Sequence, residues 1–369
     1  MKSMLYTDLN TDLNIDLNTD FLKKLCAANG ASSRESAVSS IILDEIKDYV
    51  DEYKIDALGN LIARKKRPEE SGNSDKNGKS GDSGKKMMLA GHMDQVGLMV
   101  TYISKEGFLY FSKVGGNSPG YCLGQRFVFP NGVIAVAASE RLDNPKDLTL
   151  EKMYLDIGAR DDEDANSKVK IGDICVFDQQ PVVSDGVFIS PAIDDRVGCF
   201  IMIEALKRLK NPAYDIYLVF TAQEEVGLRG AKTAAFDIDP DYGLSFDVTI
   251  SADTPKSRKF PSKMYGGAAI KIKDASLLCH PVIIDHLEKC AANAQIKYQF
   301  EILEHGGTDS GAIHITRGGV PSGVISVATR YIHSANEMCA LSDIEACISL
   351  AVKALEVGVV DNDAEKYGS

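Results

Sequence analysis

The chain has 369 residues, of which 44% are apolar and 25% charged, so it exceeds one typical domain and fits no collagen-like, fully disordered or disulfide-scaffold class. Its net charge of −12 argues against a nucleic-acid partner, because nucleic-acid-binding proteins usually present a basic surface. No apolar run approaches the roughly 18 residues that span a bilayer, and the polar, acidic start of the chain does not look like a secretory signal.

The cysteine spacing likewise shows no sign of a metal-binding or redox motif. None of the eight is spaced as C-x-x-C, so neither a zinc ribbon nor a redox pair is predicted. We expect reduced, buried thiols in a cytoplasmic protein that does not associate with membranes.

The first hundred residues mix helical and extended patterns. A period-four repeat at residues 8–18 is assigned no function. Helices are expected at 21–28 and 35–49, and strands at 61–63 and 87–90. The intervening residues 68–86 contain no large apolar side chain and predict a disordered loop. Residues 87–100 form an almost continuous apolar run, which predicts a buried strand with polar groups at its end.

The middle of the chain has a β-rich pattern. Short extended runs separated by turn residues are typical of a small barrel or sandwich, with one short helix near 161–168. These runs are residues 108–114, 126–129, 133–137, 174–177 and 187–189.

After residue 194, strands and helices alternate. Strands are expected at 216–221, 244–250, 298–303 and 324–327, and helices at 197–209, 228–235, 282–292 and 344–357. This alternation predicts an α/β fold with helices on both faces of the sheet. We therefore expect a discontinuous catalytic domain, residues 1–102 and 188–369, interrupted by an inserted barrel-like β domain at 103–187.

Metal-type ligands follow several of the expected strands. They are His92 with Asp94, Asp194 with Asp195, Glu224 with Glu225, Asp247, and His333. Sites in open α/β sheets form at the carboxyl ends of strands, and buried carboxylates need a cation or a partner. Helix capping and salt bridges are the alternative explanation, most plainly for Asp195 beside Arg196.

The spacing of His92 and Asp94 adds a second clue. Residues two apart in a strand face the same side, and a metal-bound imidazole usually donates its other N–H to a carboxylate. Asp94 is therefore placed to orient His92, although a core histidine satisfied by a neighbouring carboxylate would give the same pattern.

Six motifs, in order along the chain, resemble the tetrahedral aminopeptidases, a family of co-catalytic metallopeptidases that includes glutamyl aminopeptidases and carried an endoglucanase-like label in older usage. The motifs are residues 90–100 (AGHMDQVGLMV), 191–198 (PAIDDRVG), 223–231 (QEEVGLRGA), 247–249 (DVT), 306–314 (GGTDSGAIH) and 330–334 (RYIHS). The resemblance runs from about residue 21 to residue 357.

The resemblance implies two divalent ions per subunit, and zinc and cobalt both fit such a site, although oxygen and nitrogen ligands alone do not choose the metal. It implies five ligands: His92 and Asp247 on one ion, Glu225 and His333 on the other, and Asp194 bridging the two. Glu224 would be the general base that activates a metal-bridging water, and Asp94 would orient His92. Asp195 would follow Asp194 through a cis peptide, and Thr308 and Asp309 would lie near the substrate.

Two departures from the family pattern, Gln95 in place of a glutamate and a long 68–86 loop, remove no ligand. Asp253 is the alternative to Asp247 as a ligand.

The implied activity is removal of N-terminal residues from short peptides with a free N-terminus. A dimer-based homo-oligomer is implied as well, and the family extends it to a hollow tetrahedral dodecamer with contacts through the β insert. Three other functions remain open at this stage: another di-metal amide hydrolase such as a deacylase or dipeptidase, a glycosidase, and an inactive assembly subunit. The sequence leaves the preferred N-terminal residue open.

Overall fold

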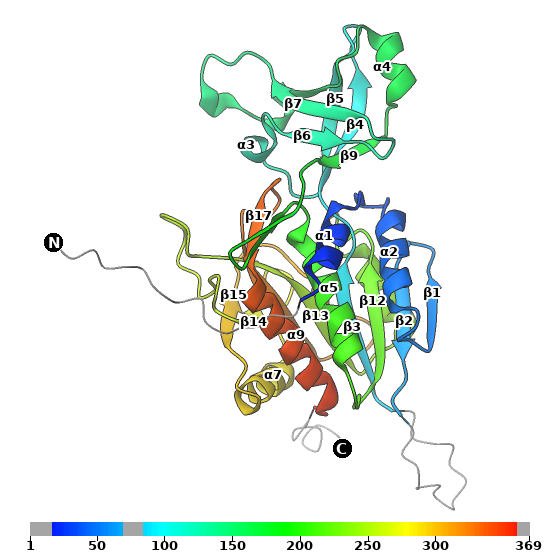
Figure 1. Cartoon of the computed structure of the whole chain (residues 1–369), viewed down its shortest axis with the longest axis vertical. Helices are drawn as coiled ribbons and strands as arrows, with labels where there is room; N and C mark the ends of the chain where they lie inside the picture. The colour runs from blue at the N-terminus through cyan, green and yellow to red at the C-terminus, as the bar shows by residue number, and fades with distance from the viewer. Residues whose placement is uncertain (1–16, 69–83, 360–369) are drawn as a thin grey trace, which may run out of the picture.

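The computed structural model describes residues 17–68 and 84–359. Within them the chain forms a large mixed sheet covered by helices and a separate closed barrel, joined at one edge of the sheet (Figure 1). The repeat at residues 8–18 and the expected 68–86 loop lie almost entirely outside the described residues.

The large sheet has eleven strands, and its central strands are parallel, as expected for an α/β domain with both faces covered. In spatial order the main path is β1 (Glu52–Ile55), β2 (Leu61–Lys65), β12 (Asp215–Thr221), β3 (Lys86–His92), β13 (Tyr242–Ile250), β16 (Ser322–Arg330), β17 (Glu337–Ala340), β11 (Val187–Ser190) and β10 (Val182–Ser184). A branch from β16 adds β14 (Ala268–Lys273) and then β15 (Tyr298–Ile302).

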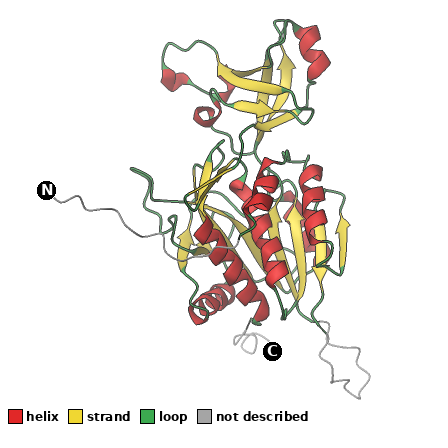
Figure 2. Cartoon of the chain, viewed as in Figure 1, coloured by secondary structure: helices red, strands yellow, loops and turns green. Residues whose placement is uncertain are grey.

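Helices cover both faces of this sheet, which confirms the predicted fold class (Figure 2). One face packs against α1 (Thr19–Ala27), α2 (Ser36–Ile46), α5 (Ile193–Arg208), α7 (Pro281–Asn293) and α9 (Leu341–Glu356). The other face packs against α6 (Arg229–Ile238) and the short α8 (Ser310–Ile313). None of the described helices is both long and apolar enough to cross a bilayer.

The barrel is closed by six strands and encloses its own apolar core around Phe127 and Leu155. Its strands are β4 (Gly97–Ile103), β5 (Leu109–Val114), β8 (Met153–Asp156), β7 (Ile134–Ser139), β6 (Arg126–Val128) and β9 (Ile174–Phe177). Two helices, α3 (Pro119–Cys122) and α4 (Asp162–Lys168), and the 3₁₀ turns Pro145–Asp147 and Leu150–Lys152 decorate it.

Two local features differ from the sequence expectation. Residues 87–100 form two strands, not one: β3 ends at His92 in the sheet, and β4 begins at Gly97 in the barrel. A Cβ on Gly97 would lie 2.8 Å from the carbonyl oxygen of Cys175, so glycine permits this close strand approach. Residues 187–189, expected among the β-rich runs of the insert, pair with β17 in the large sheet.

Candidate metal centre

The candidate ligands gather where the parallel strands β12, β3, β13 and β16 end. His92 is the last residue of β3, and Asp247 lies near the end of β13. Glu224 and Glu225 follow β12, and His333 follows β16. Asp194 enters from the turn that begins α5, so five separate segments converge on one edge of the sheet, as expected for an open α/β domain.

Asp194 stands at the centre of the cluster. Its Oδ1 lies 3.0 Å from His92 Nε2, and its Oδ2 lies 3.2 Å from His333 Nε2. His333 Nε2 is also 3.2 Å from Glu225 Oε1. The ligand atoms of His92, Asp194 and Glu225 form one group within 4.8 Å of one another, and those of His92, Glu224 and Asp247 form a second.

The orientation of both imidazoles fits a metal-bound state. His92 Nδ1 lies 3.0 Å from the carbonyl oxygen of Asp94, and His333 Nδ1 lies 2.8 Å from that of Gly116. A carbonyl only accepts, so each Nδ1 carries a proton and each Nε2 faces a carboxylate oxygen of Asp194. A nitrogen and an oxygen in such contact share either a proton or a metal ion, and this arrangement is that of metal-binding histidines.

The charges of the site also favour a bound cation. Burial raises the pKa of Asp247, and the neighbouring Asp194 raises it further. Burial likewise raises the pKa of Glu224 and of Glu225. Burial lowers the pKa of His333, but Asp194 and Glu225 more than offset this and raise it to about 12. The cluster therefore attracts positive charge, which divalent ions would supply when bound.

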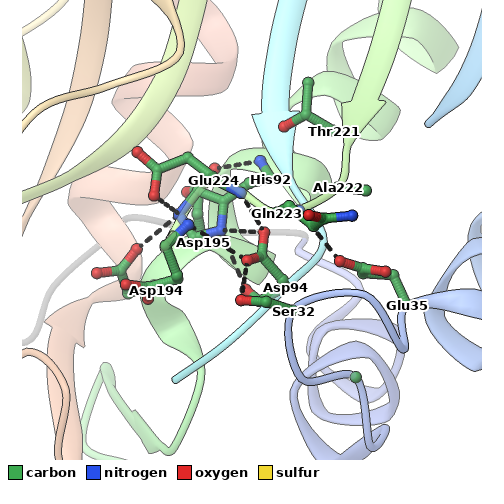
Figure 3. A network of polar contacts seen from close by, with 12 residues as sticks. Ser32, Glu35, His92, Asp94, Asp194, Asp195, Thr221, Ala222, Gln223 and Glu224 are labelled. Carbon is green, nitrogen blue, oxygen red and sulfur yellow. Dashed lines mark hydrogen bonds and ion pairs between the residues drawn. The ribbon is translucent and has the colours of Figure 1, made fainter. Parts of the chain in front are cut away.

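Asp94 has two roles in this arrangement. Its main-chain carbonyl orients His92, while its carboxylate Oδ1 lies 3.5 Å from the same ring nitrogen. The carboxylate itself accepts the backbone N–H groups of Glu224 at 2.9 Å and Glu225 at 3.2 Å, and the hydroxyl of Ser32 at 2.6 Å (Figure 3). The sequence predicted that the carboxylate of Asp94 would orient His92, whereas its carbonyl makes the shorter contact, and the sequence gave no sign of the second role.

Asp195 lies outside both ligand groups formed by the described residues. The peptide bond between Asp194 and Asp195 is cis. The Asp195 carboxylate accepts backbone N–H groups of His92 at 3.1 Å and Gly198 at 2.9 Å. Its role is therefore to tie the end of β3 to the start of α5.

The residues expected near the substrate and the alternative metal ligand lie in three different environments. Thr308 lines the cleft beside the cluster, and its hydroxyl donates to Asp274. Asp309 is buried, accepts the hydroxyl of Thr221 at 2.5 Å, and is not among the residues lining the cleft. Asp253 forms a two-bond ion pair with Arg330 outside the ligand groups, so the geometry favours Asp247 as the ligand.

Gln95 also lies outside the ligand groups formed by the described residues. Its side-chain amide donates to the carbonyl oxygen of Ala28 at 3.3 Å. The departure from the family's usual glutamate therefore leaves the donor set intact.

Sequence reasoning missed Glu337. This buried carboxylate accepts the backbone N–H of Asp194 at 2.9 Å and that of His333 at 2.7 Å. Burial, and then the charge of Asp194, raises its pKa to about 8. Glu337 thus joins two ligand segments that are 139 positions apart, and no local pattern in the sequence announces that contact.

The sequence analysis also missed Gly116, a residue of the β insert whose carbonyl oxygen contacts His333. A Cβ at this position would lie 2.6 Å from His333 Nδ1. We expect Gly116→Ala to displace the imidazole and weaken metal binding about 10- to 100-fold, the usual effect of losing a partner that orients a ligand. Competition with a chromogenic chelator measures this.

Gly120→Ala is the matched control for that variant. Gly120 lies in the same insert, and a Cβ there would meet nothing within 4 Å. Unchanged metal affinity in Gly116→Ala, equal to that of Gly120→Ala, would contradict the role given to the Gly116 carbonyl.

The cluster opens into a cleft of about 650 Å³. Glu224 and Asp247 line its floor, and Leu228, Val248, Leu303 and Ile332 contribute apolar walls. A cleft of this size accommodates a short peptide and not a folded domain.

Comparison with known proteins gives a consistent result. The sequence profile of the M42 glutamyl aminopeptidases matches residues 72–350. A relative from Acetivibrio thermocellus, itself assigned only provisionally as an aminopeptidase, is 50% identical over 90% of this chain and 97% of its own.

Solved structures agree with these sequence matches. An aminopeptidase from the archaeon Desulfurococcus kamchatkensis superposes with a TM-score of 0.85 at 34% identity, covering 91% of this chain and 94% of its own. The Pyrococcus horikoshii TET1 peptidase, described as assembling into a tetrahedron or a large octahedral shell, superposes with a TM-score of 0.78 at 29% identity, covering 92% and 99%.

Proposed function

This chain belongs to the M42 glutamyl aminopeptidase family and is a metal-dependent aminopeptidase, and we propose that it works with two divalent ions held by the cluster around Asp194. His92 and Asp247 would hold one ion, Glu225 and His333 the other, and Asp194 would bridge them. The observation that carries this proposal is the pair of imidazole Nε2 atoms directed at opposite oxygens of one carboxylate, with each Nδ1 held by a backbone carbonyl. Zinc and cobalt both suit such a nitrogen and oxygen ligand set.

When bound, such ions lower the pKa of water and polarise the carbonyl of the scissile bond. Glu224 would then take a proton from the attacking water and pass it to the amine that leaves. The position of its carboxylate suits this role, because it lines the cleft, with Oε2 3.8 Å from His92 Nε2. Glu224 lies in a ligand-type group with His92 and Asp247, and Glu225 lies in one with His92 and Asp194, so the two neighbouring carboxylates face different partners.

An aminopeptidase must also recognise the free α-amine of its substrate. The cleft is rich in carboxylates at its floor, and we propose that they attract this cation. Acetylation removes the charge and adds bulk at that point. We expect Leu-Ala-Ala to be cut at least about 100-fold faster than its N-acetylated form, because a site built for a polar group rejects an analogue that lacks it.

Mass spectrometry of both peptides with the metal-loaded enzyme tests this, with a chelator-treated sample as control. Cleavage of both forms at similar rates would move the substrate class to a deacylase or endopeptidase. Activity that survives the chelator would overturn the metal dependence itself.

We propose that the protein forms a dimer-based homo-oligomer through its inserted barrel. Such exposure is typical of interfaces, and six large apolar side chains of the barrel, residues 97–177, are exposed: Tyr102, Tyr121, Leu123, Ile134, Val136 and Ile171. The tetrahedral assembly of the Pyrococcus horikoshii relative makes a dodecamer the leading arrangement. Light scattering after size exclusion measures the mass, and a monomer would contradict the proposal.

We also propose a cytoplasmic location. All eight cysteines lie within the described residues, and all are buried and free. Free thiols are typical of proteins that work in a reducing compartment.

A further inference from the structure

We propose that Glu35 is a positioning residue, which fixes the backbone just before Glu224 and Glu225 and thereby sets the geometry of the metal centre. It lies at the start of α2, far from the cleft in sequence and outside the stretch that matches the family profile. The inference rests on the function proposed for the cleft and concerns a residue that is neither among the described cleft-lining residues nor in a ligand group.

The segment after β12 has an unusual pattern of support. Its four consecutive backbone N–H groups, those of residues 222–225, are each accepted by a buried side-chain oxygen. Asn60 Oδ1 accepts from residue 222 at 2.9 Å, Glu35 Oε1 from residue 223 at 3.1 Å, and the two oxygens of Asp94 accept from residues 224 and 225. The catalytic segment is thus held through its main chain by three side chains.

Glu35 is suited to hold its part of this segment. Its side chain points at Gln223 from the side of the N-terminal helices (Figure 3). The same Oε1 also accepts the N–H of Ser33 at 2.7 Å, so one oxygen joins two turns that are distant in sequence. The residue is only 4% exposed, so water does not readily replace either bond.

Gln223 is the residue that most needs such support. Its φ is +59°, in the left-handed region that is unfavourable for a residue with a side chain. Conformations of this kind persist only where the surroundings hold them. If Glu35 released the N–H of Gln223, the following carboxylates would be free to shift, and a displacement of about 1 Å at a reacting group costs up to about 100-fold in rate.

Glu35 must act through the backbone, because it does not line the catalytic cleft. It lines a different hollow, of about 440 Å³, between the start of α2 and the turn at residues 55–59. Its effect should therefore appear in kcat, with little change in KM, because the walls of the peptide cleft are untouched.

The test compares three variants with the metal-loaded wild-type enzyme. Glu35→Ala is expected to lower kcat at least tenfold while KM stays within about twofold and the metal content is retained. Glu35→Gln keeps a carbonyl oxygen able to accept both N–H groups and should recover at least a third of the wild-type kcat. Asp44→Ala, which removes an exposed carboxylate paired with Lys47 on the same helix, is the control and should not change kcat.

Hydrogen exchange read by mass spectrometry provides the second readout. The peptide spanning residues 222–228 should exchange faster in Glu35→Ala and return toward the wild-type rate in Glu35→Gln. Wild-type kcat and wild-type hydrogen exchange in Glu35→Ala would overturn the inference. So would a Glu35→Gln variant whose kcat is as low as that of Glu35→Ala while its hydrogen exchange is that of the wild type, because the loss of charge would then be the cause.

Two further outcomes keep the test decisive. If Glu35→Ala does not fold, Glu35→Asp carries the test, because it keeps the charge and withdraws the oxygen by one methylene; wild-type kcat in that variant would overturn the inference. If the wild-type enzyme cuts no peptide, the proposed function fails, while the exchange measurement still decides whether Glu35 holds the segment.

Discussion

Glu224→Gln is expected to keep its bound metal and to lose at least about two orders of magnitude in kcat, because the amide cannot take a proton from water. Glutamine has nearly the same size, and the backbone N–H of residue 224 would still be held by Asp94. Metal content by plasma mass spectrometry and steady-state kinetics on a short peptide measure the two effects separately.

Glu304→Gln is the matched control, since this exposed glutamate pairs with Arg258 and is not among the cleft-lining residues, although its neighbours Leu303 and His305 are. If Glu224→Gln lost its metal and Glu225→Gln retained it, Glu224 would be the metal ligand and Glu225 the general base. The geometry makes this a real test, because Glu224 also lies in a ligand-type group with His92 and Asp247.

Asp194→Asn should have the second large effect. This carboxylate faces both imidazoles, so replacing it with a neutral amide removes the group shared by the two proposed ions. We expect kcat/KM to fall by at least about two orders of magnitude and metal content to fall well below that of the wild-type protein, because both positions lose an anionic ligand.

Asp253→Asn is the control for this variant, because Asp253 is the nearby aspartate that the sequence left as a rival ligand and it is paired with Arg330. It should retain metal and activity. If Asp253→Asn lost metal and Asp194→Asn did not, the ligand set would have to be redrawn around the Arg330 side of the cleft.

Much of the catalytic site could be predicted because its groups sit at strand ends with local signatures. Adjacent carboxylates after apolar runs marked the pairs Asp194-Asp195 and Glu224-Glu225, and the His-x-Asp spacing marked His92, but the role of each residue came from the resemblance to the tetrahedral aminopeptidases. The structure brings all five candidate ligands into one cluster. Asp94 illustrates the limit of this reasoning, because its carboxylate holds a backbone segment 130 positions away.

The supporting residues could not be predicted for the same physical reason. Glu35, Glu337 and Gly116 act on segments far away in sequence, and their own neighbourhoods look like ordinary helix starts and turns. Strand β14 was likewise missed, because its pairing with β15 and β16 is set by the sheet and not by a distinctive local pattern. The division into a catalytic domain and a β insert with boundaries at 103 and 187 stays a prediction. In the structure, the barrel strands run from Gly97 to Phe177.

The most direct test of the two-ion site is a crystal structure of the metal-loaded protein with anomalous scattering data collected at the metal's absorption edge. Our account predicts two peaks per chain on opposite sides of the Asp194 carboxylate, one beside His92 and Asp247 and the other beside Glu225 and His333. A single peak, or a peak coordinated by Asp253, would contradict it.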